Sequence, residues 1–418
     1  MNEVIRSIAE QCSQLKSGVN EQALLQLRPY IEGFLDTKWL EGELRKYQDW
    51  ASRNSDPSLQ RSLLHRPLGF NMLVASIWAA RNWESIHKKD TSFRAPMGAE
   101  RLINVACCLA VLELHAGQFL DSEAREHLRQ RLQAADQVWG VIHELQTFAY
   151  FVRKGAEVEP HFLQKFSVQE MTVNWHGVHI PVQCKCKPPG SGRIICQDIF
   201  TDLACRISRD AKAYGKRLLV RIGSTGTIRQ EDVEFLRRQV SIGVGARMRP
   251  ALVTHMSRTF TVRSQPLSGQ FTVATMQDYL SSFNFHIGMV IGEPAPDGAG
   301  YNAVAVVVIE ANLQEEIAWN SLKSSIMEGA KQLKNGPPGI VAIYYADPVR
   351  DFEALSPAPE PMKVSIGQLL DSRPHVGAVI MASEPDLQLP QTSALGHVSV
   401  YYKKPWPFPS DFLSNEFT

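Results

Sequence analysis

Two neighbouring stretches are the most informative about the fold: HELQTFAYFVRKGAEVEP at residues 143–160 and QEMTVNWHGVHIPVQCKCK at residues 169–187. The first belongs to a predicted helix from about residue 136 to residue 154, which ends where Gly155 can adopt a positive φ. The second contains two runs of alternating residues, 170–174 and 178–185, separated by Trp-His-Gly. This pattern predicts a β-hairpin directly after the helix.

Working outward from the hairpin, the sequence predicts a helix over about 197–214 and then a strand over 217–222. The order helix, strand, strand, helix, strand forms one predicted core of about 90 residues, 136–225. Residues 1–135 read as helical, with apolar residues at three- and four-residue spacing. Residues 226–418 read as a further α/β region, with strands at 286–292, 303–310 and 339–345 and a helix at about 315–333. The proline-rich tail KKPWPFPSDF is expected to lie over the surface.

The two quoted stretches resemble the PD-(D/E)XK, or restriction-endonuclease-like, nuclease superfamily over about a fifth of the chain. In that family a glutamate on the first helix precedes a hairpin that carries D…(D/E)XK. The resemblance assigns these roles to Glu144, Glu170, Gln183 and Lys185. It therefore implies an α/β fold with a helical N-terminal region, a central αββαβ core and a C-terminal α/β region.

The residue types suit metal-assisted hydrolysis of a phosphodiester. Mg²⁺, or Mn²⁺ in its place, prefers hard oxygen ligands, which Glu144, Glu170 and Gln183 would supply. A bound metal lowers the pKa of its water, and a lysine beside it stabilises developing negative charge. Because side chains alternate along a strand, Gln183 and Lys185 should share one face of their strand.

Two positions depart from the usual family motif. Glu170 stands where the family has Asp, and Gln183 stands where it usually has Glu. The Gln-X-Lys form is similar to that of Mrr-type branches, which act on modified DNA. Together the two changes leave an alternative open, in which the domain keeps the nuclease fold as an inactive module for nucleic-acid binding or assembly. A third reading is an interaction protein without any nucleic-acid role.

A basic stretch runs from residue 206 to residue 263. It contains thirteen Lys or Arg residues and four acids, a difference of 13 − 4 = +9, although the whole chain carries only +1. Such a stretch can neutralise phosphates, or it can be a solvated surface balanced by acids elsewhere. The predicted backbone contacts are Lys187, Arg206, Arg209, Lys212, Arg237 and Arg238.

Composition narrows the class of protein. The chain has 418 residues, of which 44% are apolar and 21% charged. No uninterrupted apolar run approaches the length of a membrane span, and the N-terminus lacks a signal-peptide pattern. Seven cysteines without paired CxxC spacing are typical of free thiols in a reducing compartment. We therefore expect a cytoplasmic protein with no membrane partner. A homo-oligomer is compatible with the sequence.

Zinc sites are poor matches to the sequence. His143-Glu144 begins like HExxH, but Thr147 stands at the second histidine position. The spacing of Cys184, Cys186, Cys196 and Cys205 is not that of a zinc finger or ribbon. The leading prediction is therefore a Mg²⁺- or Mn²⁺-dependent nuclease that acts on DNA, in defence or repair.

Overall fold

The computed structural model of the protein describes residues 21–53, 70–82, 97–167, 169–187, 195, 197–246, 251–267, 285–294, 301–310, 314–333, 336–345, 360–383, 398–403, 405 and 407–412. The chain divides into two compact units. Unit 1 comprises Met1–Arg53, Gly69–Pro189 and Leu322–Thr418, and unit 2 comprises Asn54–Leu68 and Gly190–Ser321. Most of unit 2 is thus an insertion in the chain of unit 1.

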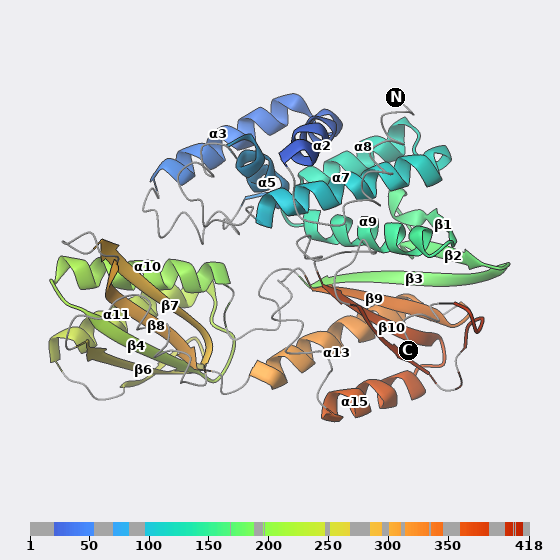
Figure 1. Ribbon diagram of the computed structural model, residues 1–418. Coiled ribbons are helices and arrows are strands. Elements are labelled where there is room, and N and C mark those ends of the chain that lie inside the picture. The colour runs from blue at the N-terminus through green and yellow to red at the C-terminus, as the bar shows by residue number, and fades with distance from the viewer. Residues whose placement is uncertain are drawn as a thin grey trace. The chain divides into compact units, whose positions relative to one another are not determined.

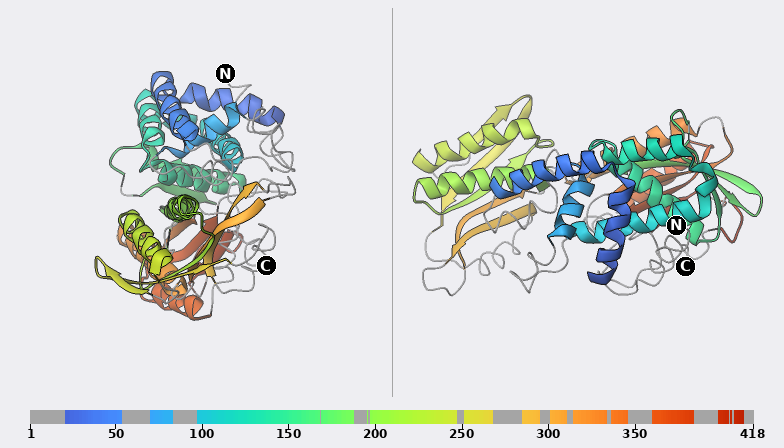
Figure 2. Two further views of the ribbon diagram at one scale, coloured as in Figure 1. Left: turned by 90° about the vertical axis from the view of Figure 1, so that its left-hand side faces the viewer. Right: turned by 90° about the horizontal axis from the view of Figure 1, so that it is seen from above.

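The N-terminal part of unit 1 is helical, as its apolar spacing predicts. The helices are α2 (Glu21–Phe34), α3 (Thr37–Arg53), α5 (Met72–Arg81), α7 (Met97–Ala116), α8 (Ser122–Gln133) and α9 (Val138–Arg153). Polar side chains fix two of the starts: Asn71 caps α5 by accepting the Leu73 N–H, and Asp121 caps α8 by accepting the Ala124 N–H. Figure 2 shows these helices, blue to green, gathered together.

Helix α9 is the centre of unit 1. Every residue from Val141 to Phe151 is buried, which is typical of a helix enclosed by two layers rather than one. It packs against α7 on one side and against strands β1 and β3 on the other (Figure 1). It ends at Gly155, whose φ of 92° confirms the predicted stop.

The sheet of unit 1 has six strands in the order β1-β2-β3-β9-β10-β11. Their bounds are β1 (Glu157–Pro160), β2 (Met171–Trp175), β3 (Val178–Lys187), β9 (Gly339–Tyr345), β10 (Val376–Ser383) and β11 (Val398–Tyr402). The first three are antiparallel, β3 runs parallel to β9, β9 parallel to β10, and β11 closes the sheet antiparallel.

The predicted hairpin is confirmed as β2 and β3. Its turn places His176 and Gly177 at φ values of 50° and 82°, the two consecutive positive values of a tight hairpin turn. The side chain of Asn174 accepts the Gly177 N–H at 3.0 Å and closes the turn.

Helices α13 (Gln314–Gln332) and α15 (Glu360–Asp371) cover the face of this sheet opposite α9 (Figure 1). The approach of α13 is close: a Cβ at Gly329 would lie 2.7 Å from Cγ1 of Val341 on β9. A glycine is therefore needed where this helix crosses the sheet.

Unit 2 is an α/β unit of its own. Its sheet has the order β5-β6-β4-β8-β7, and α10 (Gln197–Ala213) and α11 (Gln230–Ala246) pack against it. The strands are β4 (Leu218–Ser224), β5 (Ala251–His255), β6 (Arg258–Pro266), β7 (Phe285–Pro294) and β8 (Tyr301–Glu310). The mixed α/β class predicted from sequence is thereby established.

The predicted contiguous core of residues 136–225 requires correction. The helix and strand that follow the hairpin in sequence, α10 and β4, belong to the sheet of unit 2. The strand that joins β3 in its own sheet is β9, with Gln183 paired with Val341 and Cys184 with Ala342. Strand pairing depends on tertiary contacts, so the nearest apolar strand in the sequence need not be the partner.

The expectation that the tail lies over the surface is also wrong for its end. Phe412 is fully buried and stacks on Phe151 of α9 at 6.0 Å, with Trp175 at 5.4 Å. Asp411 accepts hydrogen bonds from the Trp175 indole N–H, at 3.1 Å, and from the His176 ring, at 2.9 Å. Prolines exclude a regular element here, but aromatic residues between them still fill the core of unit 1.

Candidate functional site

The four residues of the predicted motif come from three places in unit 1. Glu144 lies on α9, Glu170 directly precedes β2, and Gln183 and Lys185 lie on β3. The register pairs Met171 with Val182, so one further step places Glu170 opposite Gln183. The backbone N–H of Cys184 donates to Oε2 of Glu170 at 3.3 Å, which ties the carboxylate to β3.

Strand alternation separates the neighbours of the motif as predicted. The thiol of Cys184 is hydrogen-bonded to Thr147, so it points toward α9. Lys185 points to the opposite side, where Nζ lies 3.1 Å from Oε1 of Glu328 on α13. Gln183, two residues earlier, shares the face of Lys185.

Two carboxylates and one ammonium influence one another at this end of the hairpin. Burial and the neighbouring charge of Glu144 raise the pKa of Glu170 to about 7, against an opposing effect of Lys185. Burial raises the pKa of Glu144 as well, opposed by Arg131 and Lys185. The charges of Glu144, Glu170 and Lys185 therefore influence one another, although Glu144 lies on the α9 side of the sheet and Lys185 points to the α13 side.

Glu144 is held by a residue that the sequence did not single out. Its two oxygens accept hydrogen bonds from Nη1 and Nη2 of Arg131, each at 2.8 Å, and Nη1 also donates to the Phe162 carbonyl at 3.1 Å. Such a bidentate pair fixes the carboxylate firmly. Arg131 follows Arg125 and Arg129 in the charged helix SEAREHLRQRLQ, and no local signal distinguishes it from them.

Gln183 is a buried amide with no hydrogen-bond partner. Its residue is 0% exposed, and both Nε2 and Oε1 lack a partner. Leaving a buried polar group unpaired costs about 1–3 kcal/mol. It is the feature of the site that most needs an explanation.

These residues fit a divalent cation in part. Glu170 and Gln183 offer one carboxylate and one amide oxygen, the hard donors that Mg²⁺ prefers. Glu144 is a weaker candidate ligand, because each of its oxygens already accepts a hydrogen bond from the Arg131 cation. Among the described residues no group of three or more His, Cys, Asp or Glu is arranged to hold a metal ion.

The zinc readings gain no support within the described residues. His143 is buried, with ring nitrogens 3.1 Å from the Ala342 carbonyl and 3.2 Å from the Thr147 hydroxyl, and burial lowers its pKa to about 4. Cys184 and Cys205 are buried thiols that form no disulfide, and Cys196 lies outside the described residues.

Two findings in the N-terminal helices bear on sequence expectations. Cys107 is disulfide-bonded, which corrects the expectation of free thiols at that position. The helical segment Arg101–Phe119 has a mean hydropathy of 1.5 over a span-length window, and 67% of that window is buried. Such burial is typical of a core helix, although length and composition alone would allow a membrane span.

The predicted phosphate-contacting residues are distributed over both units. Lys187 follows Lys185 in unit 1, while Arg206, Arg209, Lys212, Arg237 and Arg238 lie in unit 2. Within unit 2, residues 190–321 contain 14 Lys and Arg and 12 Asp and Glu, a difference of 14 − 12 = +2. The excess of the basic stretch is thus largely balanced by acids outside it.

Several of these arginines form ion pairs with acids of unit 2. Arg206 pairs with Asp202 at 2.8 Å, Arg237 with Asp210 at 2.8 Å, and Arg238 with Glu234 at 3.2 Å. Arg209 and Lys212 are exposed on α10. The reading of a solvated, charge-balanced surface therefore describes this part of unit 2 better than a dedicated phosphate-binding face.

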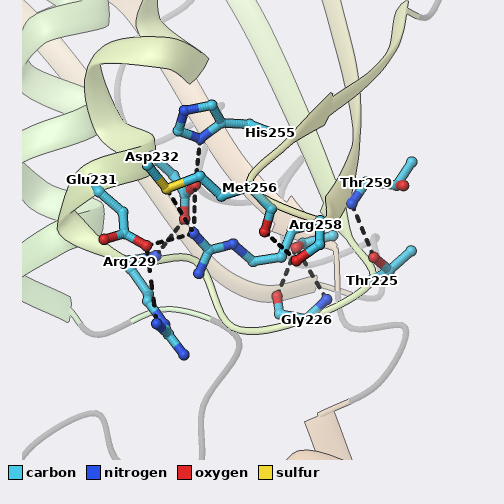
Figure 3. Close-up of polar contacts among 11 residues, drawn as sticks. Thr225, Gly226, Arg229, Glu231, Asp232, His255, Met256, Arg258 and Thr259 are labelled. Atoms are coloured by element: carbon cyan, nitrogen blue, oxygen red, sulfur yellow. Dashed lines mark hydrogen bonds and ion pairs between the residues drawn. The ribbon is translucent and has the colours of Figure 1, made fainter.

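A second polar cluster in unit 2 joins the start of α11 to the β5–β6 hairpin (Figure 3). Asp232, fully buried, accepts from the Arg229 backbone N–H at 2.8 Å, lies 2.9 Å from Nδ1 of His255, and accepts from Arg258 at 3.0 Å. Arg258 also donates to Glu231 at 2.7 Å. These contacts are internal to the cluster, and they explain how the hairpin is anchored to the helix.

Comparisons with known proteins give no family assignment: no family model, no curated protein and no solved structure matches the chain.

Proposed function

We propose that this chain hydrolyses phosphodiester bonds in DNA with the help of a divalent metal ion, Mg²⁺ or Mn²⁺. The observation that carries the proposal is the electrostatic coupling of Glu170 to Glu144 and Lys185, on a hairpin that also carries the buried, unpartnered amide of Gln183.

The order of elements in unit 1 supports the same proposal. Within unit 1, the next helix after α9 and the β2–β3 hairpin is α13. It is followed by strand β9, which pairs parallel with β3. These occupy the places that the resemblance to PD-(D/E)XK nucleases assigned to α10 and β4. The likeness to that superfamily is therefore retained as a proposal, with the second half of the core supplied by residues after the inserted unit.

The residues of the chain have distinct roles in this proposal. Glu170 and Gln183 would hold the metal ion, and Glu144 would add its negative charge from the α9 side of the sheet; a bound metal would supply a water of lowered pKa and neutralise phosphate charge. The ammonium of Lys185 would stabilise the negative charge that develops on the phosphate.

Cleavage of supercoiled plasmid DNA in Mg²⁺ or Mn²⁺ tests the proposal. We expect metal-dependent cutting by the wild-type protein, and its loss in Lys185→Ala and in Glu170→Ala. Matched controls are Lys46→Ala and Glu123→Ala, which remove the same charges from exposed ion pairs of unit 1. Cutting that survives both site substitutions in folded protein would refute the assignment of these residues.

A second candidate function is an inactive nuclease-fold module that binds nucleic acid. The observation in its favour is that the Arg131 cation engages both oxygens of Glu144, which neutralises the charge of this acid and weakens it as a metal ligand. This reading predicts no cutting of duplex, single-stranded or modified DNA by wild-type protein. It also predicts a gel shift with the same DNA in EDTA.

A further inference from the structure

Lys185 has a partner that the sequence did not reveal. Its Nζ lies 3.1 Å from Oε1 of Glu328, a residue of α13, in the part of that helix that belongs to unit 1. The two side chains differ greatly in exposure: that of Lys185 is 14% exposed and that of Glu328 is 65% exposed. A mostly buried ammonium is therefore paired with a carboxylate that stands in solvent.

The packing of α13 explains why Glu328 reaches the site. Its neighbour Gly329 lies directly on Val341, where a Cβ would come within 2.7 Å of the valine. Val341 is paired in register with Gln183, two residues before Lys185. The glycine thus lets the helix approach β9 closely enough for residue 328 to contact Lys185 across the strand.

The acids around Lys185 fall into two groups. Glu144 and Glu170 are largely buried and act on Lys185 from within the site. Glu328 is the exposed one, and its charge also acts on Lys187, whose pKa is lowered by burial. Of these three acids, Glu328 is the one that can leave Lys185 at little cost, because an exposed carboxylate regains its hydration.

We propose that Glu328 is a counter-ion that occupies the substrate position on Lys185 and that a phosphodiester group displaces. A carboxylate and a phosphate present similar anionic oxygens to an ammonium, so the two compete for Lys185. The inference rests on the proposed function, since it names a residue that regulates access of substrate to that site. It predicts that Glu328 weakens substrate binding without taking part in the chemical step.

The first measurement is binding of a fluorescein-labelled DNA duplex in Ca²⁺ by anisotropy, with wild type, Glu328→Gln, Lys185→Ala and the double variant. We expect Glu328→Gln to bind DNA about two- to fivefold more tightly, the range that a surface ion pair can supply. The gain should vanish in the Lys185→Ala background. Glu43→Gln is the matched control, because it removes a carboxylate from the Lys46 ion pair on α3.

The second measurement is plasmid cleavage in Mg²⁺ with the same variants. Displacement predicts a lower KM for Glu328→Gln with kcat unchanged. A lower kcat with unchanged KM would overturn the inference and make Glu328 a positioning residue for Lys185. Equal affinity of Glu328→Gln and wild type for the duplex would overturn it as well.

The two proposals fail separately in this design. Absence of cleavage by every variant refutes the proposed hydrolysis, while tighter Lys185-dependent binding by Glu328→Gln would still support the counter-ion. Absence of both binding and cleavage in all variants refutes both proposals.

Discussion

Replacement of Gln183 by Met should stabilise the protein and abolish its cleavage of DNA. The side chain of Gln183 is completely buried, and neither polar atom of its amide has a partner. Methionine has a similar length and no polar group that needs a hydrogen bond. The unfolded state hydrates the glutamine amide fully, so the folded wild type alone carries the cost of its desolvation.

The magnitude follows from the number of unpaired groups. One unsatisfied buried polar group costs about 1–3 kcal/mol. The Gln183 amide has two such groups, and local relaxation recovers part of the cost of the second. We therefore expect Gln183→Met to raise the free energy of unfolding of unit 1 by about 1–3 kcal/mol. If Gln183 supplies a ligand oxygen, plasmid cleavage should fall to background in the same variant.

Equilibrium unfolding in urea measures the stability, and plasmid cleavage in Mg²⁺ measures the activity. Gln146→Met is the matched control, because Gln146 is also buried with both amide atoms unpaired but lies outside the candidate site. It should gain similar stability and keep its activity. A loss of stability on Gln183→Met alone would refute the reasoning, since it would mean that the amide is satisfied.

Three other predictions concern unit 1. Burial raises the pKa of Glu170 to about 7, so the folded protein favours the neutral acid. The stability that this group contributes is fully present below about pH 4.5, and it is lost as the pH rises through 7. Between pH 5 and pH 8 the free energy of unfolding, measured in urea, should therefore fall less in Glu170→Gln than in wild type, by up to about 3 kcal/mol. An equal fall in both proteins would contradict this. Phe412→Ala should lower the free energy of unfolding by about 3–5 kcal/mol, whereas Phe166→Ala, at a side chain 95% exposed, should leave it nearly unchanged. Arg131→Met should destabilise the protein by about 3 kcal/mol at pH 8, and adding Glu144→Gln should restore part of the loss; additive losses in this double-mutant cycle would exclude the pair.

Local sequence signals predicted the elements of the site with good accuracy. The helix that carries Glu144 ends at Gly155, and the hairpin that carries Gln183 and Lys185 turns at His176 and Gly177, as expected. These features depend on residues that are neighbours along the chain, such as a glycine that can adopt a positive φ or a run of alternating apolar and polar residues. The opposite orientations of Cys184 and Lys185 follow from the same local rule of strand alternation.

Contacts between distant segments escaped the sequence. Arg131 and Glu328 are ordinary charged residues of charged helices, and only the packing of α8 and α13 brings them to Glu144 and Lys185. The acids that pair with the basic stretch escaped the sequence for the same reason. Arg237, for example, pairs with Asp210 of a neighbouring helix.

By itself, the sequence determined the class of the fold, the helix and hairpin that carry the candidate site, and the residues that share a strand face, because each of these depends on short-range sterics and on hydrophobic periodicity. Only the tertiary structure decided that β3 pairs with β9 and not with β4, and that a second unit is inserted between them. Apolar strands such as β4 and β9 carry similar local patterns, and the free energy that distinguishes one pairing from another lies in side-chain packing across the whole sheet.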